Sequence, residues 1–207
     1  MFEHRLFNDF VILLVVIDPI NVIPAFMLFT QYDSPEARKR TALRAVVIAA
    51  VILVAFIIAG QILLEALRID LPSFSIAGGL VLLAVSLQRI LRPAERPAKE
   101  EVDEAAESPQ DVAVFPLATP LIAGPGSIIT VVLLTDNEQF GIVEQMQTTL
   151  VMLGILVLLY LMLLVAERIQ RFLGNTGADV LSRIAGLVLA AISVDIIIDG
   201  IRASFFA

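Results

Sequence analysis

The sequence predicts an all-α membrane protein, with six transmembrane helices arranged as two inverted three-helix repeats and with helices 1 and 4 broken near the midplane. The first observation behind this prediction is composition: 58% of the 207 residues are hydrophobic and the mean hydropathy is +0.92. Soluble domains contain roughly 45 to 50% apolar residues. The second observation is a series of apolar runs of about 20 residues, the length that crosses a bilayer. The third is a pair of proline-interrupted segments at matching places in the two halves.

The apolar runs form two groups of three, separated by a charged linker. We expect spans at residues 7–30, 43–65, 72–92, 112–135, 147–167 and 183–205. The first repeat then covers residues 1–91 and the second covers residues 112–207. The linker, residues 92–111, contains three prolines and seven acidic side chains, a composition typical of a solvated segment. At the start of the second helix, Asp33-Ser34-Pro35-Glu36 predicts a capping turn with proline at the first helical position. Gly174-Asn175-Thr176-Gly177 predicts a loop before the last span.

The first and fourth spans each contain two prolines five positions apart, Pro19 with Pro24 and Pro120 with Pro125. A proline inside a helix removes a backbone hydrogen bond and breaks or kinks the helix. Lipid cannot satisfy the backbone groups that are freed, so each break must be buried in protein or line a cavity. Paired breaks in corresponding halves of a membrane protein point to the substrate site of a transporter.

The third and sixth spans carry a second sign of repetition. The segment from Ile76 to Ser86 resembles the segment from Ile184 to Ser193 once one glycine is skipped. Coincidence between two apolar helices is the alternative explanation, because matches among Leu, Val and Ala are common. The proline pairs correspond as well, which favours a repeat of three helices in each half.

Positive charges predict the orientation, because Lys and Arg are retained in short cytoplasmic loops. Of the 14 Lys and Arg residues, only three lie on the other side, and the remainder fall in or beside three connections. The retained residues are Arg38, Lys39, Arg40 and Arg44, then Arg89, Arg92, Arg96 and Lys99, then Arg168, Arg171 and Arg183; the others are Arg5, Arg68 and Arg202. Both termini should therefore face outward from the cell (inner) membrane, and a second half with three spans must cross in the opposite sense.

Three polar features fall near the middle of their spans: Asp18, the Gly124-Pro125-Gly126 break and Asp195. An ionised carboxylate at that depth costs about 2.5 to 3.5 kcal/mol on insertion scales, so an intramembrane acid is a candidate functional group. Asp18 has two interpretations, a ligand-binding group or a cap for the backbone that Pro19 frees. Asp195 has no basic neighbour in sequence, and desolvation favours a neutral carboxyl, so Asp195 and Asp18 are candidates for proton coupling. We expect Asp199 to pair with Arg202.

The broken helices together suit a small zwitterion. Because the spans place no Lys or Arg at the midplane, a carboxylate would be held by backbone N–H groups after Gly124-Pro125-Gly126, helped by Ser127 and Thr130. An ammonium group would be received by Asp18, Asn21 and the carbonyls freed in the first span. The predicted substrate-binding residues are Asp18, Pro19, Asn21, Pro24, Thr119, Gly124, Pro125, Gly126 and Ser127.

These residues resemble the MarC family of six-helix bacterial and archaeal inner-membrane proteins over nearly the whole chain. The resemblance rests on residues 18–26, 76–79, 116–126, 186–191 and 198–201, and the segment 116–126 is the most specific. It implies a three-plus-three inverted repeat, a cavity between broken helices 1 and 4, and proton-coupled transport of small neutral amino acids such as glycine or alanine. Sodium is the alternative coupling ion. The chain departs from the family pattern at Asn21-Val22, where Gly-Asn is usual, and at Asp195, where the resemblance leads us to expect an uncharged polar residue such as Gln.

Other functions remain open. The same architecture would serve an exporter of amino acids or other small polar solutes, and a channel or a membrane scaffold is a further class. An intramembrane enzyme lacks support, since the chain has no Cys, its single His is His4, and Ser127 has no evident partner base. We expect no cofactor, no metal and, at a net charge of −7, no nucleic-acid partner. The lipid bilayer is the expected environment, and the sequence does not indicate an oligomeric state.

Overall fold

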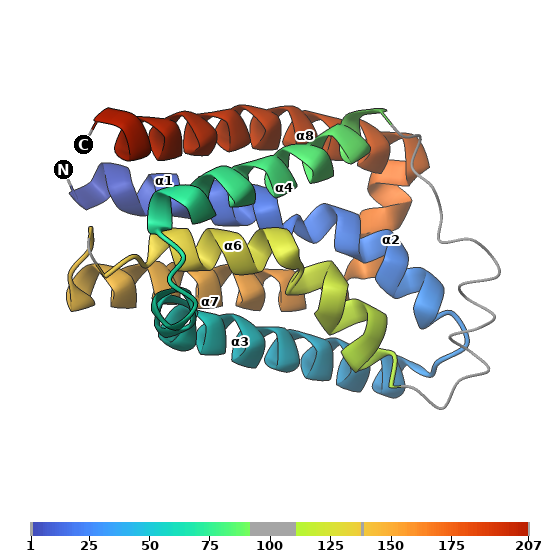
Figure 1. Cartoon of the computed structure of the whole chain (residues 1–207). Helices are drawn as coiled ribbons and strands as arrows, with labels where there is room; N and C mark the ends of the chain where they lie inside the picture. The colour runs from blue at the N-terminus through green and yellow to red at the C-terminus, as the bar shows by residue number, and fades with distance from the viewer. Residues whose placement is uncertain (1, 92–110, 138, 207) are drawn as a thin grey trace.

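The computed structural model describes residues 2–91, 111–137 and 139–206, and within them the chain is helical, with no β-strand (Figure 1). The helices run in chain order: α1 (Phe2–Ile17), α2 (Pro19–Phe29), α3 (Pro35–Ala66), α4 (Leu71–Leu91), the π-helical segment η1 (Ala113–Ile122), α6 (Pro125–Leu134), α7 (Ile142–Leu164) and α8 (Ala166–Phe206). Most of the predicted linker, residues 92–110, lies outside the described residues.

Five stretches of the described chain are long and apolar enough to cross a membrane, and the bent pair η1–α6 makes a sixth if it is counted as one span. The five are Arg5–Phe29, Pro35–Ala66, Leu71–Leu91, Ile142–Leu164 and Thr176–Phe205. The prediction of an all-α, multi-pass membrane protein is therefore confirmed. Both termini lie at one end of the molecule, which we call the terminal end, and the end of α4 and the start of η1 lie at the other, the linker end (Figure 1).

The capping turn before α3 forms as predicted. Ser34 is the N-cap, its hydroxyl oxygen accepts a hydrogen bond from the Ala37 N–H at 3.2 Å, and Pro35 occupies the first turn. The helix begins eight positions before the predicted span at residue 43, because hydropathy marks only the part that suits lipid and the helix continues into a polar turn. At Gly174 the chain interrupts α8 with a φ of 63° and a ψ of 179°, so the predicted loop is reduced to a kink at one residue.

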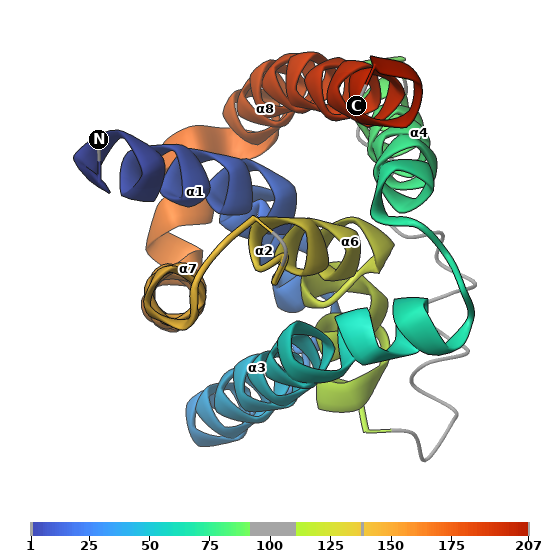
Figure 2. The same ribbon diagram turned by 60° about the vertical axis from the view of Figure 1, so that its left-hand side comes forward.

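The helices pack around two separate apolar cores. The larger core is formed by buried residues of α1, α2, α3, η1, α6 and α7, including Leu53, Leu117 and Leu159. The smaller core contains Val16, Leu82 and Leu189, which join α1, α4 and α8. In Figure 2, α4 and α8 accordingly lie side by side as a pair at the edge of the remaining bundle.

Small residues let α4 and α8 approach each other closely along their length. A Cβ atom on Gly79 would lie 2.9 Å from the Ser193 carbonyl oxygen, and one on Gly186 would lie 3.3 Å from the Ser86 carbonyl oxygen. A third approach joins Gly200 to the Pro72 carbonyl, again at 2.9 Å. Along these three contacts the residue numbers increase in α4 and decrease in α8, so the two helices are antiparallel.

Candidate functional site

The first span is interrupted at Asp18. Helix α1 ends at Ile17, α2 begins at Pro19, and Asp18 between them has left-handed dihedral angles, φ 48° and ψ 68°. Asp is one of the few residues other than glycine that adopts this conformation readily. Pro19 has no N–H, so the Val15 carbonyl four positions earlier loses the hydrogen bond that an unbroken helix would supply. The interruption is enclosed by protein, since Asp18 is 4% exposed.

Arg89 of α4 supplies the missing donors. Its guanidinium donates hydrogen bonds to the Val15 carbonyl at 3.1 Å and to the Val16 carbonyl at 3.3 Å. A cation at this place also complements the partial negative charge of the C-terminal end of α1. The expectation that no Lys or Arg lies at the level of Asp18 was therefore wrong. Arg89 lies in the last turn of α4, and its long side chain extends from there to the interruption.

The same guanidinium pairs with Asp18. The Arg89 Nη1 and Asp18 Oδ2 atoms are 3.1 Å apart, and the side chains are only 15% and 5% exposed. The other carboxylate oxygen, Oδ1, accepts a long hydrogen bond of 3.4 Å from the Asn21 N–H. Asp18 thus caps α2, which agrees with the interpretation of Asp18 as a helix cap. It also belongs to a buried ion pair.

The second interruption lies between η1 and α6, whose axes bend by 54°. Gly124 is the N-cap of α6, and no side chain caps this helix. A Cβ atom at Gly124 would lie 2.3 Å from the Pro120 carbonyl oxygen, so the turn requires glycine. The Ser127 hydroxyl donates to the Ile122 carbonyl at 2.8 Å and so joins the two sides of the bend. The Thr119 hydroxyl donates to the Val114 carbonyl at 3.3 Å, within η1.

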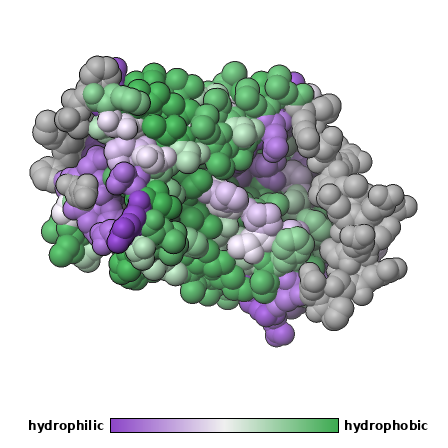
Figure 3. All heavy atoms as spheres, in the orientation of Figure 1, coloured by the Kyte–Doolittle hydropathy of each residue, from purple (hydrophilic) through white to green (hydrophobic). Residues whose placement is uncertain are grey.

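The two interruptions meet beside α4. A Cβ atom on Gly126 would lie 3.0 Å from Leu82 and 3.6 Å from Val16, which places the first turn of α6 against the last turn of α1. Figure 3 shows a pale, weakly polar area over the η1–α6 junction, within an otherwise apolar face. The C-terminal end of α1 carries a partial negative charge here, and the N-terminal end of α6 carries a partial positive charge.

Thr130 adds a polar group to α6. It is 1% exposed, and its hydroxyl has no hydrogen-bond partner among the described residues. Thr130 follows Ser127 by three positions and therefore lies on the same side of the helix. Buried hydroxyls are normally hydrogen-bonded, so this one can accept a donor or donate to an acceptor from a ligand.

The remaining predicted residues differ in how deeply they are buried. Pro19 is buried with Asp18, whereas Asn21 and Pro125 are exposed and Pro24 and Thr119 are partly buried. Asp195 is also exposed, on α8. Asp199 pairs with Arg202 at 3.5 Å, as predicted. No group of three or more metal-ligating side chains occurs in the described parts of the chain.

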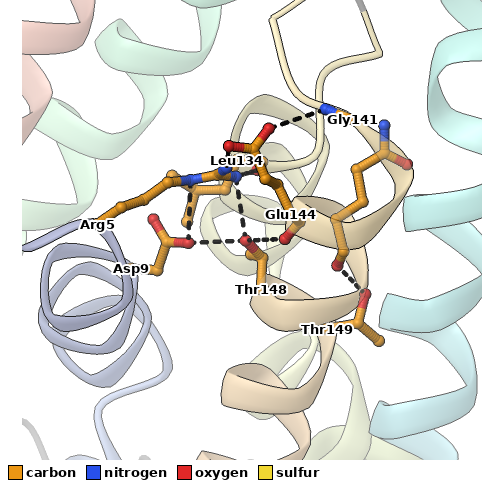
Figure 4. A network of polar contacts seen from close by, with 8 residues as sticks. Arg5, Asp9, Leu134, Gly141, Glu144, Thr148 and Thr149 are labelled. Carbon is orange, nitrogen blue, oxygen red and sulfur yellow. Dashed lines mark hydrogen bonds and ion pairs between the residues drawn. The ribbon is translucent and has the colours of Figure 1, made fainter. Parts of the chain in front are cut away.

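The sequence prediction missed a network of charged and hydroxyl groups at the terminal end, which joins α1 to α7 (Figure 4). Arg5 pairs with Glu144 at 3.1 Å and with Asp9 at 3.8 Å. Asp9, 2% exposed, accepts a hydrogen bond from the fully buried Thr148 hydroxyl at 2.7 Å. The guanidinium of Arg5 also lies 3.8 Å from the centre of the Phe140 ring. The signal available was Asp9 itself, a second acid within the first apolar run.

A second missed pair links α3 to the segment after α6. Gln61 Nε2 donates to Asp136 Oδ1 at 2.7 Å, and the two residues are 9% and 1% exposed. In the sequence, Gln61 is a polar residue inside the second apolar run and Asp136 follows the fourth. Nothing in the spacing of these two residues indicated that they would meet.

Comparison with known proteins gives a consistent family assignment. The chain matches the family described as "MarC family integral membrane protein" over residues 3–205. It is 36% identical to a UPF0056 membrane protein of Methanocaldococcus jannaschii, over 90% of this chain and 91% of that protein. It is 33% identical to one of Aquifex aeolicus, over 93% and 90% of the two chains, and 30% identical to one of Escherichia coli, over 96% and 93%. No solved structure matches the chain.

Proposed function

The chain belongs to the MarC family of integral membrane proteins, and from this premise we propose that it is a secondary transporter of small neutral amino acids such as glycine and alanine. Transport would take place across the cytoplasmic membrane, with both termini outside and with the substrate held between the interruptions at Asp18 and Gly124. The observation that carries the proposal is the buried Asp18–Arg89 pair at the place where the two interrupted spans meet.

The packing of α4 on α8 supports the inverted repeat on which the proposal depends. In the alignment of the third and sixth spans, Gly79 corresponds to Gly186 and Ser86 corresponds to Ser193. Gly79 approaches Ser193, and Gly186 approaches Ser86. When two segments are related by a twofold axis, a contact between two residues is repeated between their counterparts. The two contacts have this reciprocal pattern. The corresponding residues Leu82 and Leu189 also share the smaller core.

The geometry of the ion pair explains why a zwitterion is the expected substrate. Removing one partner of a buried ion pair leaves a buried charge uncompensated and is strongly unfavourable. A zwitterion inserted between Asp18 and Arg89 supplies both charges, so neither side chain is left unpaired. The Val15 and Val16 carbonyls, which now accept from the guanidinium, would accept from the substrate ammonium. Arg89 and the N–H groups at the start of α6 would then hold the carboxylate.

The site also favours a small side chain on the substrate. Val16 and Leu82 lie against Gly126, where even one added carbon atom would meet Leu82 at 3.0 Å. Glycine or alanine demands the least rearrangement of these apolar side chains. Asp18 and Asp195 are the candidates for coupling to a proton, and sodium is the alternative coupling ion.

Uptake of a panel of radiolabelled amino acids into proteoliposomes, with and without an imposed proton or sodium gradient, tests the proposal. We expect glycine or alanine to accumulate and Asp18→Asn and Arg89→Gln each to reduce accumulation at least tenfold. Asp199→Asn is the matched control, since it neutralises an exposed acid that pairs with Arg202 away from the site. If folded wild-type protein accumulates no amino acid under either gradient, the transporter proposal is wrong.

A further inference from the structure

A polar cavity of about 610 Å³ opens at the terminal end, away from the two interruptions. Its walls come from the end of α3, the α3–α4 connection, the start of α4, the end of α8 and Asp136 after α6. Figure 3 shows hydrophilic surface over this end of the molecule. The polar side chains that line the cavity are those of Gln61, Glu65, Arg68, Asp70, Ser73 and Asp136, together with Ser204. We call this cavity the terminal-end vestibule.

The floor of the vestibule carries hydrogen-bond acceptors. The Gln61 NH₂ group donates a hydrogen bond to Asp136 at 2.7 Å. The Gln61 carbonyl oxygen, Oε1, can therefore accept a hydrogen bond from another donor. That oxygen is inaccessible to solvent and has no hydrogen-bond partner among the described residues, and Gln61 as a whole is 9% exposed. A buried amide oxygen without a donor is costly, so a ligand with N–H groups would stabilise this arrangement.

The charges around the floor indicate what kind of ligand would bind. Three of the lining side chains are acidic, Glu65, Asp70 and Asp136, and Arg68 is basic. A primary ammonium group has three donors and no acceptor, which suits the Gln61 carbonyl and the carboxylate beside it. Arg68 is exposed together with the acidic Glu65 and Asp70, whereas Gln61 and Asp136 are buried, so the mouth carries one positive charge beside two negative ones and the floor carries acceptors. A small zwitterion bound with its ammonium inward would match both.

We propose that the terminal-end vestibule is a second amino-acid site, which holds the substrate ammonium on Gln61 and Asp136 and its carboxylate near Arg68. This inference rests on the proposed function and extends it with a place for the substrate outside the central site. Helix α6 connects the two places, because it begins at the second interruption and ends just before Asp136. Its ten residues correspond to a separation of about 15 Å at 1.5 Å per residue. One substrate molecule cannot occupy both sites.

The absence of cysteine from the chain allows a direct test. Ser73→Cys places a single thiol in the vestibule, where a cationic methanethiosulfonate reagent measures access in purified, reconstituted protein. We expect alanine and ethylamine to slow labelling and propionate, which lacks the ammonium group, to leave it unchanged. Gln139→Cys is the matched control, because Gln139 is exposed and does not line the vestibule. Its labelling should be unaffected by any of the three compounds.

Substitutions at the floor then decide whether protection comes from these side chains. In the Ser73→Cys background, Asp136→Asn and Gln61→Met should each raise the alanine concentration for half-protection by roughly tenfold to a hundredfold, the range for losing a hydrogen bond to a charged group. If Asp136→Asn fails to fold, Gln61→Met alone decides the matter. Unchanged protection in both Asp136→Asn and Gln61→Met, or no protection by alanine in the parent, overturns the inference.

A variant of the central site tests this inference separately from the proposed function. Arg89→Gln should reduce transport as strongly as proposed above and leave alanine protection of Ser73→Cys intact. If the wild type transports amino acids but protection does not depend on Gln61 or Asp136, the vestibule proposal alone is wrong. If protection depends on them but no variant or wild type transports amino acids, the vestibule binds an amino acid and the transporter proposal is the one that fails.

Discussion

Replacing Arg89 with alanine should strongly destabilise the protein. The guanidinium holds the Val15 and Val16 carbonyls at 3.1 and 3.3 Å and pairs with Asp18 at 3.1 Å. All of these partners are freed by, or adjacent to, the interruption at Pro19. Truncation removes every one of these contacts together and leaves a 4% exposed carboxylate without its cation.

The magnitude follows from the burial of the pair. Breaking a buried ion pair by removing one partner costs about 3 to 5 kcal/mol, and we expect Arg89→Ala to fall near the lower value because the Arg89 side chain is still 15% exposed. Asp18→Asn leaves the guanidinium on its two carbonyls, so about 1.5 kcal/mol is expected, as for one hydrogen bond to a charged group. In the double variant no uncompensated carboxylate remains. Its destabilisation should therefore be smaller than the sum of the single effects by about 1 to 3 kcal/mol.

Reversible unfolding in detergent micelles, followed by circular dichroism at 222 nm, measures all four proteins of this cycle. Arg89→Lys is the conservative control, because an ammonium keeps the charge but cannot reproduce the planar fork across two carbonyls. It should lie between the wild type and Arg89→Ala. Additive effects of Asp18→Asn and Arg89→Ala would refute the reasoning, since they would mean that the two side chains do not interact energetically.

Three further predictions use other parts of the structure. Gly79→Leu should separate α4 from α8 and lower the unfolding temperature. Gly154→Ala is the control, because an added Cβ there meets no atom within 4 Å, and it should be neutral or stabilising by up to about 1 kcal/mol. Paired melting curves check both variants. Thr148→Val removes the 2.7 Å hydrogen bond to buried Asp9 and should cost about 1 to 3 kcal/mol, and an unchanged unfolding free energy would argue against the network of Figure 4. Asp195→Asn should leave stability within about 0.5 kcal/mol of the wild type, as for exposed sites, so that any loss of proton-driven uptake reports coupling directly; uptake that keeps its dependence on the proton gradient would remove Asp195 from the coupling candidates.

The positions of the helices were accessible from the sequence because they depend on local properties. A run of apolar residues long enough for a bilayer marks a span wherever it occurs, and five of the predicted spans match helices while the sixth matches the pair η1–α6. Local chemistry also indicated helix boundaries: Ser34 and Pro35 start α3, and Pro19 starts α2. In each case the determining contacts lie within four residues of the signal.

The partners of the polar groups were not accessible, because they come from helices distant in the chain. Asp18 was identified as a candidate, but its partner is 71 positions away, in a turn of α4 that the charge distribution assigned to a connecting loop. The Gln61–Asp136 pair and the Arg5–Asp9–Glu144–Thr148 network likewise bridge separate helices. For Asp195, the central position in the last span gave no information about which side of α8 it occupies, and its side chain is exposed in the structure.

The sequence alone determined that this chain is a membrane protein, which segments span the membrane, and at which prolines two of those spans are interrupted. These properties follow from hydropathy, capping and the missing N–H of proline, each of which acts over a single turn or span. Only the tertiary structure decided that α4 packs against α1 closely enough for Arg89 to reach the freed carbonyls. That outcome depends on the fit of Gly126 against Val16 and Leu82 and of Gly79 and Gly186 against the opposite backbone, and packing between helices far apart in the chain leaves no local signature.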